Sequence, residues 1–233
     1  MRALLLFLAL MFILAAAPAR EGAPVVVEIM TSQGCHDAPP YEAYFGALAA
    51  QDPDLLVLNC HVTYFDHKGW KDEFASPLCD QRHFEYFRTL RLSNIVTPEI
   101  VINGRQATGR TDEYGLHEAV QLARVEKPLI PLLLKKEGAD ITITLPAFTP
   151  PAPLDIWLYT YRPNDNTDVT AGANRGMTLN HFNTVANLEK IGTWDGTQTT
   201  ITYDTGNDKG MGYIALLQEY REGPIIAAGR LGD

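Results

Sequence analysis

The sequence is short of cysteine: its 233 residues contain only three, at positions 35, 60 and 79. An odd number leaves at least one thiol without an intramolecular disulfide partner in an oxidising compartment. The segment around the first of them, "GCHDAPP", also lacks a second cysteine close by. This excludes a site at which two neighbouring sulfurs cycle between dithiol and disulfide.

The chain also lacks an excess of basic residues. It carries 19 Lys and Arg against 28 Asp and Glu, a formal net charge of −9. Proteins that bind nucleic acid neutralise its phosphates with basic patches, so a nucleic-acid partner is excluded. The sequence contains no block of like charges, which is the pattern typical of an interaction tail.

Long apolar runs are absent beyond residue 17. The first residues combine Arg2, an apolar run over 3–17 and a small-x-small site at Ala17-Pro18-Ala19, which together predict a signal peptide over residues 1–19. A retained membrane anchor is the alternative, although the run is short for a bilayer span of roughly 20 residues. We expect an exported chain without a membrane segment after cleavage, periplasmic if the source is Gram-negative, where disulfides are permitted.

What the first half does contain is an alternation of strand and helix patterns. A β-branched run over 25–30 predicts a buried strand, and apolar positions at helical spacing from about residue 39 predict a helix that ends at Asp-Pro-Asp, 52–54. A second apolar run over 55–62 predicts another strand. Strand, helix and strand over this distance predict a parallel pair with a right-handed crossover.

The remainder of the first half also contains helix and strand patterns. A long irregular insert precedes a helix pattern over 78–92, then a hairpin around Asn103-Gly104 and a helix over 112–125. From residue 128 the pattern changes to short alternating runs with glycine turns, which predicts a mainly β region. The fold class expected is α/β, with an α/β domain over 20–127 followed by a sandwich-like β domain over 128–233.

Four separated blocks of this sequence resemble a known family. They are "VVVEIMTSQGC", "HVTYFDHKGWKDEFASP", "VTPEIVINGR" and "NRGMTLNHFNTVANLEKIGTWDG". In their order they resemble exported bacterial proteins of unknown function with a thioredoxin-like domain, and the resemblance covers most of the mature chain. It implies a thioredoxin-like fold for residues 20–127. In that family the first block continues as Gly-Cys-x-x-Cys-Pro-Pro, whereas here Ala38 stands at the second cysteine.

Cys35 is the candidate reactive residue. It stands just before a predicted helix N-terminus, whose unsatisfied N–H groups and positive dipole end stabilise a thiolate. The resemblance implies that Thr97-Pro98 packs beside it with a cis peptide bond and docks the partner's backbone. A lone sulfur here predicts one-sulfur disulfide exchange or a thiol adduct. The alternatives are a non-catalytic binding module and a half-buried cysteine without a role.

Cys60 and Cys79 flank the insert. Eighteen residues separate them. A disulfide that closed this loop would restrict the unfolded chain and stabilise the protein by about 3 kcal/mol in the chain-entropy model. A structural disulfide is therefore expected. Two alternatives stay open: one of the two resolves an adduct on Cys35, or both are buried thiols.

The insert and its surroundings supply a candidate wall for the site. His36, His61, Asp66 and Trp70 are expected there, although His61 on its own is typical of a hydrogen-bonded structural histidine. Cys35, His36, His61 and His67 are ligand types that suit Cu(I) or Zn, but their spacing matches no standard pattern, so no metal is predicted. His181, in the last block, could meet the thioredoxin-like domain across an interface, but a surface loop is the role expected of it.

The function expected is therefore that of an exported thioredoxin-like protein acting through Cys35. If it is an enzyme, it is a thiol-disulfide oxidoreductase that lacks the resolving cysteine. The expected partner is a protein or a small thiol or disulfide. No cofactor is expected, copper or zinc handling is the least favoured alternative, and the pattern indicates no particular oligomeric state.

Overall fold

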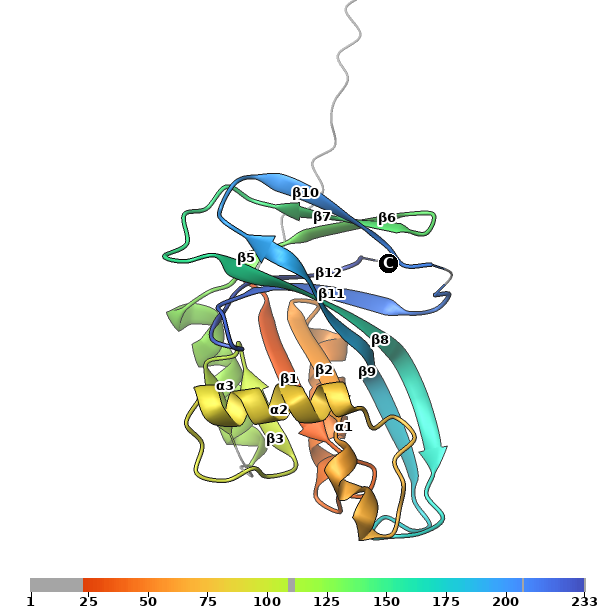
Figure 1. Ribbon diagram of the computed structural model, residues 1–233. Helices are drawn as coiled ribbons and strands as arrows, with labels where there is room; N and C mark the ends of the chain where they lie inside the picture. The colour runs from red at the N-terminus through yellow and green to blue at the C-terminus, as the bar shows by residue number, and fades with distance from the viewer. Residues whose placement is uncertain (1–22, 109–111, 207, 233) are drawn as a thin grey trace, which may run out of the picture.

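The computed structural model describes residues 23–108, 112–206 and 208–232 (Figure 1). The expected signal peptide, residues 1–19, lies outside the described residues. Within the part of the chain that is described, no helix combines the length and the apolarity needed to cross a bilayer.

The protein is a mixed α/β structure built on one large mixed sheet. This nine-stranded sheet has the order β4-β3-β1-β2-β9-β8-β11-β12-β5, and a three-stranded sheet has the order β10-β7-β6. Strands β1 and β2 pair in parallel, as expected for the first unit, and β3 pairs antiparallel to β1. The strands of the large sheet are β1 Val25–Thr31, β2 Leu55–His61, β3 Glu99–Ile102, β4 Gln106–Thr108, β5 Ile130–Pro131, β8 Leu154–Asp168, β9 Thr178–Trp194, β11 Gly212–Gln218 and β12 Ile225–Arg230.

Helices cover both faces of the β1–β2 end of this sheet. They are α1 Ala38–Gln51, α2 Pro77–Thr89 and α3 Glu113–Glu126, with a short 3-10 helix, η1, over Thr63–Lys68. Phe45 of α1 and Leu116 of α3 pack on one face, and Tyr86 of α2 packs on the other. Because both faces are covered, every residue of β1 and β2 is buried, which explains their nearly continuous apolar runs. Figure 1 shows α2 crossing the front of the sheet.

The small sheet packs on the other end of the large one, which makes this end sandwich-like. It consists of β6 Leu133–Glu137, β7 Asp140–Leu145 and β10 Thr199–Asp204. Ile141, Ile143 and Leu145 alternate with more exposed residues along β7 and pack with Leu217 and Trp194 of the large sheet. Figure 1 shows this layer at the top of the molecule.

The large sheet runs through the expected domain boundary at residues 127 and 128. That boundary falls between α3 and β5, yet β2 is joined to β9 at Asn59 and Thr184. Two side-chain amides reinforce this junction: Asn59 donates to Phe182 O at 2.6 Å, and Asn183 donates to Val57 O at 3.0 Å. The two regions therefore share backbone pairing and not only side-chain contacts.

The short-range expectations are confirmed in detail. Helix α3 begins after Asp112, whose side chain accepts a hydrogen bond from Gly115 N. The hairpin between β3 and β4 turns at Asn103-Gly104, both with positive φ. Helix α2 begins at Pro77 and ends at Thr89, slightly earlier than the expected 78–92.

Candidate functional site

The loop between β1 and α1 holds Cys35 through its backbone. Cys35 N donates to Ser32 O at 3.0 Å, and Gly34 N donates to the Ser32 hydroxyl at 3.0 Å. The buried amide of Asn174 donates to both Gln33 O and Cys35 O, at 2.8 and 2.9 Å. A side chain from the C-terminal region therefore fixes the loop that carries the cysteine.

The Cys35 thiol lies against the segment that the sequence associates with it. Its Sγ donates to Thr97 O at 3.3 Å, and the Thr97-Pro98 peptide bond is cis, as expected. Helix α1 begins at Ala38, so the thiol also stands at a helix N-terminus. The residue is only 3% exposed, however. A reagent therefore reaches this sulfur only when the surrounding segments move.

Two neutral side chains, Tyr64 and His83, form a hydrogen-bonded chain that ends at the Thr97 hydroxyl. The Tyr64 hydroxyl lies 2.7 Å from Thr97 Oγ1 and 2.9 Å from His83 Nδ1. Burial raises the pKa of Tyr64 to about 12 and lowers the pKa of His83 to about 4, so both are neutral near pH 7. Burial likewise raises the pKa of Glu99 to about 7. Tyr64 consequently anchors Thr97 by a hydrogen bond between neutral groups.

Three of the four expected wall residues connect to Gln33, Trp70 directly and His61 and Asp66 through Asp72. Its backbone N–H donates to Asp72 at 2.8 Å, and the same Asp72 oxygen bonds His61 Nδ1 at 2.7 Å. The Trp70 indole N–H donates to Gln33 Oε1 at 2.8 Å, while Asp66 accepts a hydrogen bond from Asp72 N at 3.1 Å. The insert therefore supports the loop two residues before Cys35.

The fourth expected wall residue, His36, is exposed to solvent. His67 is also exposed, and its Nδ1 bonds Tyr64 O at 2.6 Å. Among the described residues, Cys35, His36, His61 and His67 do not come together as one group of metal ligands.

The other two cysteines form a disulfide. Cys60 of β2 and Cys79 of α2 are bonded, with their Cα atoms 5.3 Å apart. The expected disulfide is therefore present. Because both sulfurs are bonded, neither is a free thiol that could resolve an adduct on Cys35. A disulfide of this kind is consistent with an exported protein.

The favoured prediction for His181, a surface loop, is wrong, whereas the alternative, a contact with the N-terminal α/β region, agrees with the structure. His181 lies on β9, is 3% exposed, and its Nδ1 bonds Glu42 Oε2 of α1 at 3.0 Å. Glu42, also buried, accepts a second hydrogen bond from the Thr31 hydroxyl at 2.5 Å. The alternation of Thr178, Leu179, Asn180 and His181 carried a signal that was missed, because it puts His181 on the same strand face as the apolar Leu179.

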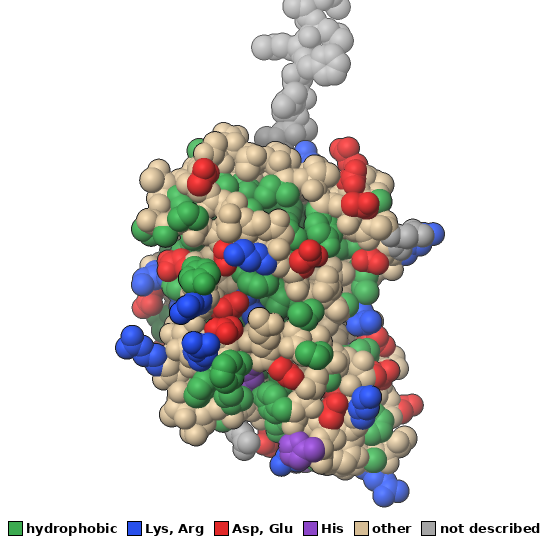
Figure 2. Space-filling view, in the orientation of Figure 1, with side chains coloured by type: hydrophobic (Ala, Val, Ile, Leu, Met, Phe, Trp, Pro, Cys, Tyr) green, Lys and Arg blue, Asp and Glu red, His purple; other side chains and the backbone are tan. Residues whose placement is uncertain are grey.

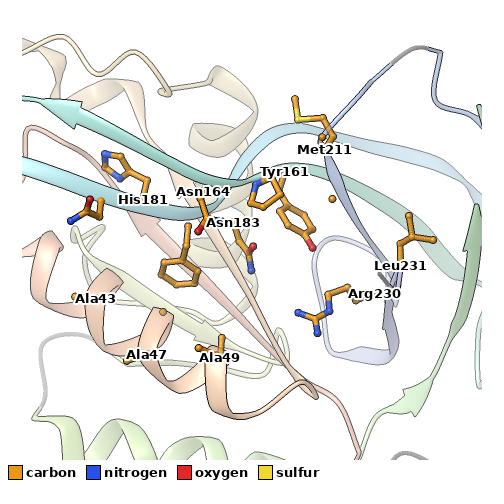
Figure 3. Close-up of a pocket in the computed structure, with 18 residues that line it drawn as sticks. Ala43, Ala47, Ala49, Tyr161, Asn164, His181, Asn183, Met211, Arg230 and Leu231 are labelled. Atoms are coloured by element: carbon orange, nitrogen blue, oxygen red, sulfur yellow. The ribbon is translucent and has the colours of Figure 1, made fainter. Parts of the chain in front are cut away.

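A cavity of about 750 Å³ opens between α1, β9 and the C-terminal strands (Figure 3). Figure 3 shows His181 near one end of it, with Tyr161, Asn164 and Arg230 farther along. The floor at α1 is formed by small residues such as Gly46, where an added Cβ would stand 2.9 Å from the Phe182 ring. The cavity is lined by alanine, asparagine and glycine more than by bulky groups.

Comparison with known proteins adds a family and a fold. A family model described as "Protein of unknown function (DUF1223)" matches residues 26–218. The crystal structure of a protein from Agrobacterium tumefaciens superimposes with a TM-score of 0.80 at 26% sequence identity, covering 91% of this chain and 96% of that one.

HBP35 of Porphyromonas gingivalis superimposes with a TM-score of 0.65 at 17% identity, covering 90% of this chain and 74% of that one. At this identity the likeness concerns the fold alone. No curated protein matches the sequence.

Proposed function

The chain belongs to the DUF1223 family of proteins of unknown function, and we propose that it is an exported thioredoxin-like protein whose Cys35 forms mixed disulfides with a protein or small-molecule partner. One observation carries the proposal. The Cys35 thiol, at the N-terminus of α1, donates to the carbonyl of Thr97 directly before a cis proline. The pairing of β1 with β2 and β3 and the hairpin to β4 are the arrangement that a thioredoxin-like domain would have.

The chemistry proposed is one step of thiol–disulfide exchange. Cys35 gives up its proton to solvent, and the thiolate attacks one sulfur of the partner's disulfide. A bond forms between Cys35 and that sulfur, the partner's S–S bond breaks, and the departing sulfur leaves as a thiolate that takes up a proton. Ala38 provides no second sulfur, so the mixed disulfide persists until an external thiol cleaves it and restores the Cys35 thiol.

Burial of Cys35 determines how a partner would reach it. The residues just before Thr97 are apolar and exposed: Ile95 is 41% and Val96 is 38% exposed. A partner with apolar residues beside its disulfide would bury this surface and displace the segment that covers the sulfur. We therefore expect peptide disulfides with apolar flanks to react faster than small charged disulfides.

The experiment uses a disulfide-containing peptide with apolar flanks and the intact mature protein. Incubation should give a single covalent adduct by mass spectrometry, mapped to Cys35, with the Cys60–Cys79 bond retained, and Cys35→Ser should give none. Added glutathione should release the peptide. An adduct that is found equally in Cys35→Ser, or none over hours in the folded wild type, overturns the proposal.

Ala38→Cys is the positive control for the site. It places a second thiol one helical turn from Cys35, whose carbonyl oxygen already accepts a hydrogen bond from Ala38 N at 3.3 Å. This variant should release the captured peptide without added thiol and reduce an insulin-type disulfide when supplied with a reductant. A folded variant that stays inert would show that Cys35 does not occupy a reactive position.

A non-catalytic binding module is the second candidate. The observation that favours it is the 3% exposure of Cys35, which is low for a nucleophile. In that case the thiol reacts only after denaturation, while the peptide binds reversibly and binding is unchanged in Cys35→Ser.

A further inference from the structure

Three buried side chains from three elements lie close together, and one of them, His61, is also a predicted wall residue of the Cys35 site. They are Glu42 of α1, His61 at the end of β2 and His181 of β9, and one potential ligand atom from each lies within 4.8 Å of the other two. Their exposures are 4%, 0% and 3%. The disulfide chemistry proposed above uses none of them.

His61 carries the strongest sign of a missing partner. Its Nδ1 bonds Asp72 at 2.7 Å, whereas its Nε2 is buried and finds no hydrogen-bond partner among the described residues. A buried polar atom without a hydrogen bond destabilises the folded state. Histidines that bind metals usually have this arrangement, with one ring nitrogen held by a carboxylate and the other directed to the ion.

His181 and Glu42 complete the donor set. The Trp70 indole N–H fixes the Gln33 carbonyl oxygen on its own side, so the Gln33 amide nitrogen faces His181 Nε2, at 3.3 Å. His181 Nδ1 therefore carries the proton and donates to Glu42. An ion bound at Nδ1 would gain an imidazole and a carboxylate together, and the imidazole proton would then stand on Nε2. The Gln33 side chain would have to turn its amide oxygen toward His181 to accept from that N–H, which breaks its hydrogen bond with Trp70.

Two of the three members, Glu42 and His181, line a cavity, whereas His61 is buried behind them. A second cavity, of about 130 Å³, is lined by Glu42 and His181 together with Met177 and Asn180. His181 also lies beside the larger cavity of Figure 3. An ion with its water can therefore approach the donor atoms of Glu42 and His181 without unfolding of the sheet.

We propose that Glu42, His61 and His181 bind a divalent first-row transition metal ion such as Zn²⁺. Two imidazoles and one carboxylate are a donor set for zinc, and they leave a fourth position open to water. Ligand atoms of a tetrahedral ion with bonds of about 2.1 Å stand about 3.4 Å apart. The three donors would therefore close by up to about 1.4 Å, through small side-chain rotations.

The test uses Zn²⁺ and Co²⁺ as probes on the intact mature protein in the Cys35→Ser background. Zn²⁺ should bind with one-to-one stoichiometry by calorimetry and raise the Tm. Co²⁺ should give visible d–d bands without the charge-transfer band of a thiolate ligand. Binding should also change the fluorescence of Trp70, identified as the signal lost in Trp70→Phe.

Variants separate this site from other histidines. His61→Gln and His181→Gln should each weaken binding at least a hundredfold, and Asp72→Asn should weaken it by about ten- to a hundredfold through His61. His117 is an exposed histidine on α3, so His117→Gln is the matched control. It should bind Zn²⁺ as tightly as the parent protein, which carries Cys35→Ser alone. If a buried variant unfolds, the stoichiometry and the Co²⁺ spectrum of the parent still decide.

Absence of one-to-one binding by the folded parent overturns the proposal, as does binding that survives His61→Gln undiminished. Loss of binding in Cys35→Ser relative to wild type would assign the metal to the thiol instead. The outcome is independent of the peptide-capture experiment, because that experiment depends on Cys35 and this one is carried out without it.

Discussion

At the residue scale, access to Cys35 depends on Thr97. The thiol donates to the Thr97 carbonyl, and the Thr97 hydroxyl shares a hydrogen bond with Tyr64. The segment before Thr97 contains exposed Ile95 and Val96 and makes few of the packing contacts that stabilise a core. We therefore propose that opening of this segment sets how fast the sulfur reacts.

Tyr64→Phe should make Cys35 more reactive. The variant keeps the ring and removes the hydroxyl that anchors Thr97, a loss of about 1 kcal/mol, or about a fivefold rise in the opened population. The rate of adduct formation with excess peptide disulfide should rise by about this factor. Tyr44→Phe removes an exposed hydroxyl bond to Glu113 O, on the other side of the sheet, and should leave the rate unchanged. An unchanged or slower rate in Tyr64→Phe would contradict gating by Thr97.

Glu99 should make stability fall as pH rises. Burial raises its pKa from 4.5 to about 7, so the folded state holds the proton more tightly than the unfolded state does. The penalty is absent below pH 4.5, grows between pH 4.5 and 7, and is complete above pH 7. We expect Glu99→Gln to unfold with a free energy about 2 kcal/mol higher than wild type at pH 8 and similar at pH 4.5.

The measurement is urea unfolding at both pH values. Glu118→Gln, on the exposed face of α3, serves as the control and should follow wild type at each. A Glu99→Gln variant that is less stable than wild type at pH 8 would show that the ionised carboxylate has a favourable partner.

At the element scale, one buried ion pair holds α2 on the sheet. Arg82 of α2 binds both oxygens of Glu28 on β1, at 2.9 and 3.1 Å. Tyr159 of β8 donates to the same carboxylate at 2.6 Å, and Tyr86 donates to it as well. The cluster therefore joins three elements at a single buried carboxylate.

Glu28→Ala should strongly destabilise the protein. The substitution leaves the Arg82 guanidinium, which is 2% exposed, without its counter-charge. Removing one partner of a buried pair costs about 3–5 kcal/mol. Glu85→Ala breaks the exposed pair with Arg88 on the same helix and should cost no more than about 0.5 kcal/mol. Comparable losses in the two variants by chemical denaturation would contradict the assigned role of the buried pair.

The sequence could predict the helices and strands but not the side-chain contacts between them. Local signals were sufficient for α3, with its Asp112 cap, and for the Asn103-Gly104 turn, because both are determined by neighbouring residues. Glu28 and Arg82 are 54 residues apart and belong to different elements. Their pairing depends on which helix covers which sheet face, and no short-range pattern records that.

The candidate site divides in the same way. The contact of Cys35 with Thr97 came from resemblance and is present. Contact of His181 with the N-terminal region was only the less favoured alternative, because its approach to Glu42, 139 residues away, requires β9 to join the sheet beside β2, which no local pattern indicates. The hydrogen bonds of Asn174 to the Cys35 loop were missed for the same reason.

At the scale of the whole molecule, the charge distribution affects which partners can bind, and the sheet topology affects how the protein unfolds. Acidic and basic side chains are interspersed on the face shown in Figure 2, without a broad basic area, in agreement with the net charge of −9. The shared sheet and the Asn59 and Asn183 side-chain bonds across it make the two regions depend on each other.

We therefore expect a single cooperative unfolding transition. Trp70 lies in the insert and Trp194 in the sandwich-like end, so variants that retain one or the other report on the two regions separately. Their urea midpoints should coincide, as should the midpoint followed by far-ultraviolet circular dichroism. Midpoints that differ would show that the regions unfold independently in spite of the shared sheet.

The most direct test of the central claim is a time course of thiol modification in the native protein, mapped by peptide mass spectrometry. We predict that Cys35 alone is modified under native conditions, while Cys60 and Cys79 remain bonded to each other. A small reagent should modify Cys35 slowly in the wild type and faster in Tyr64→Phe. Modification of Cys35 only at denaturant concentrations that unfold the whole protein would contradict this prediction.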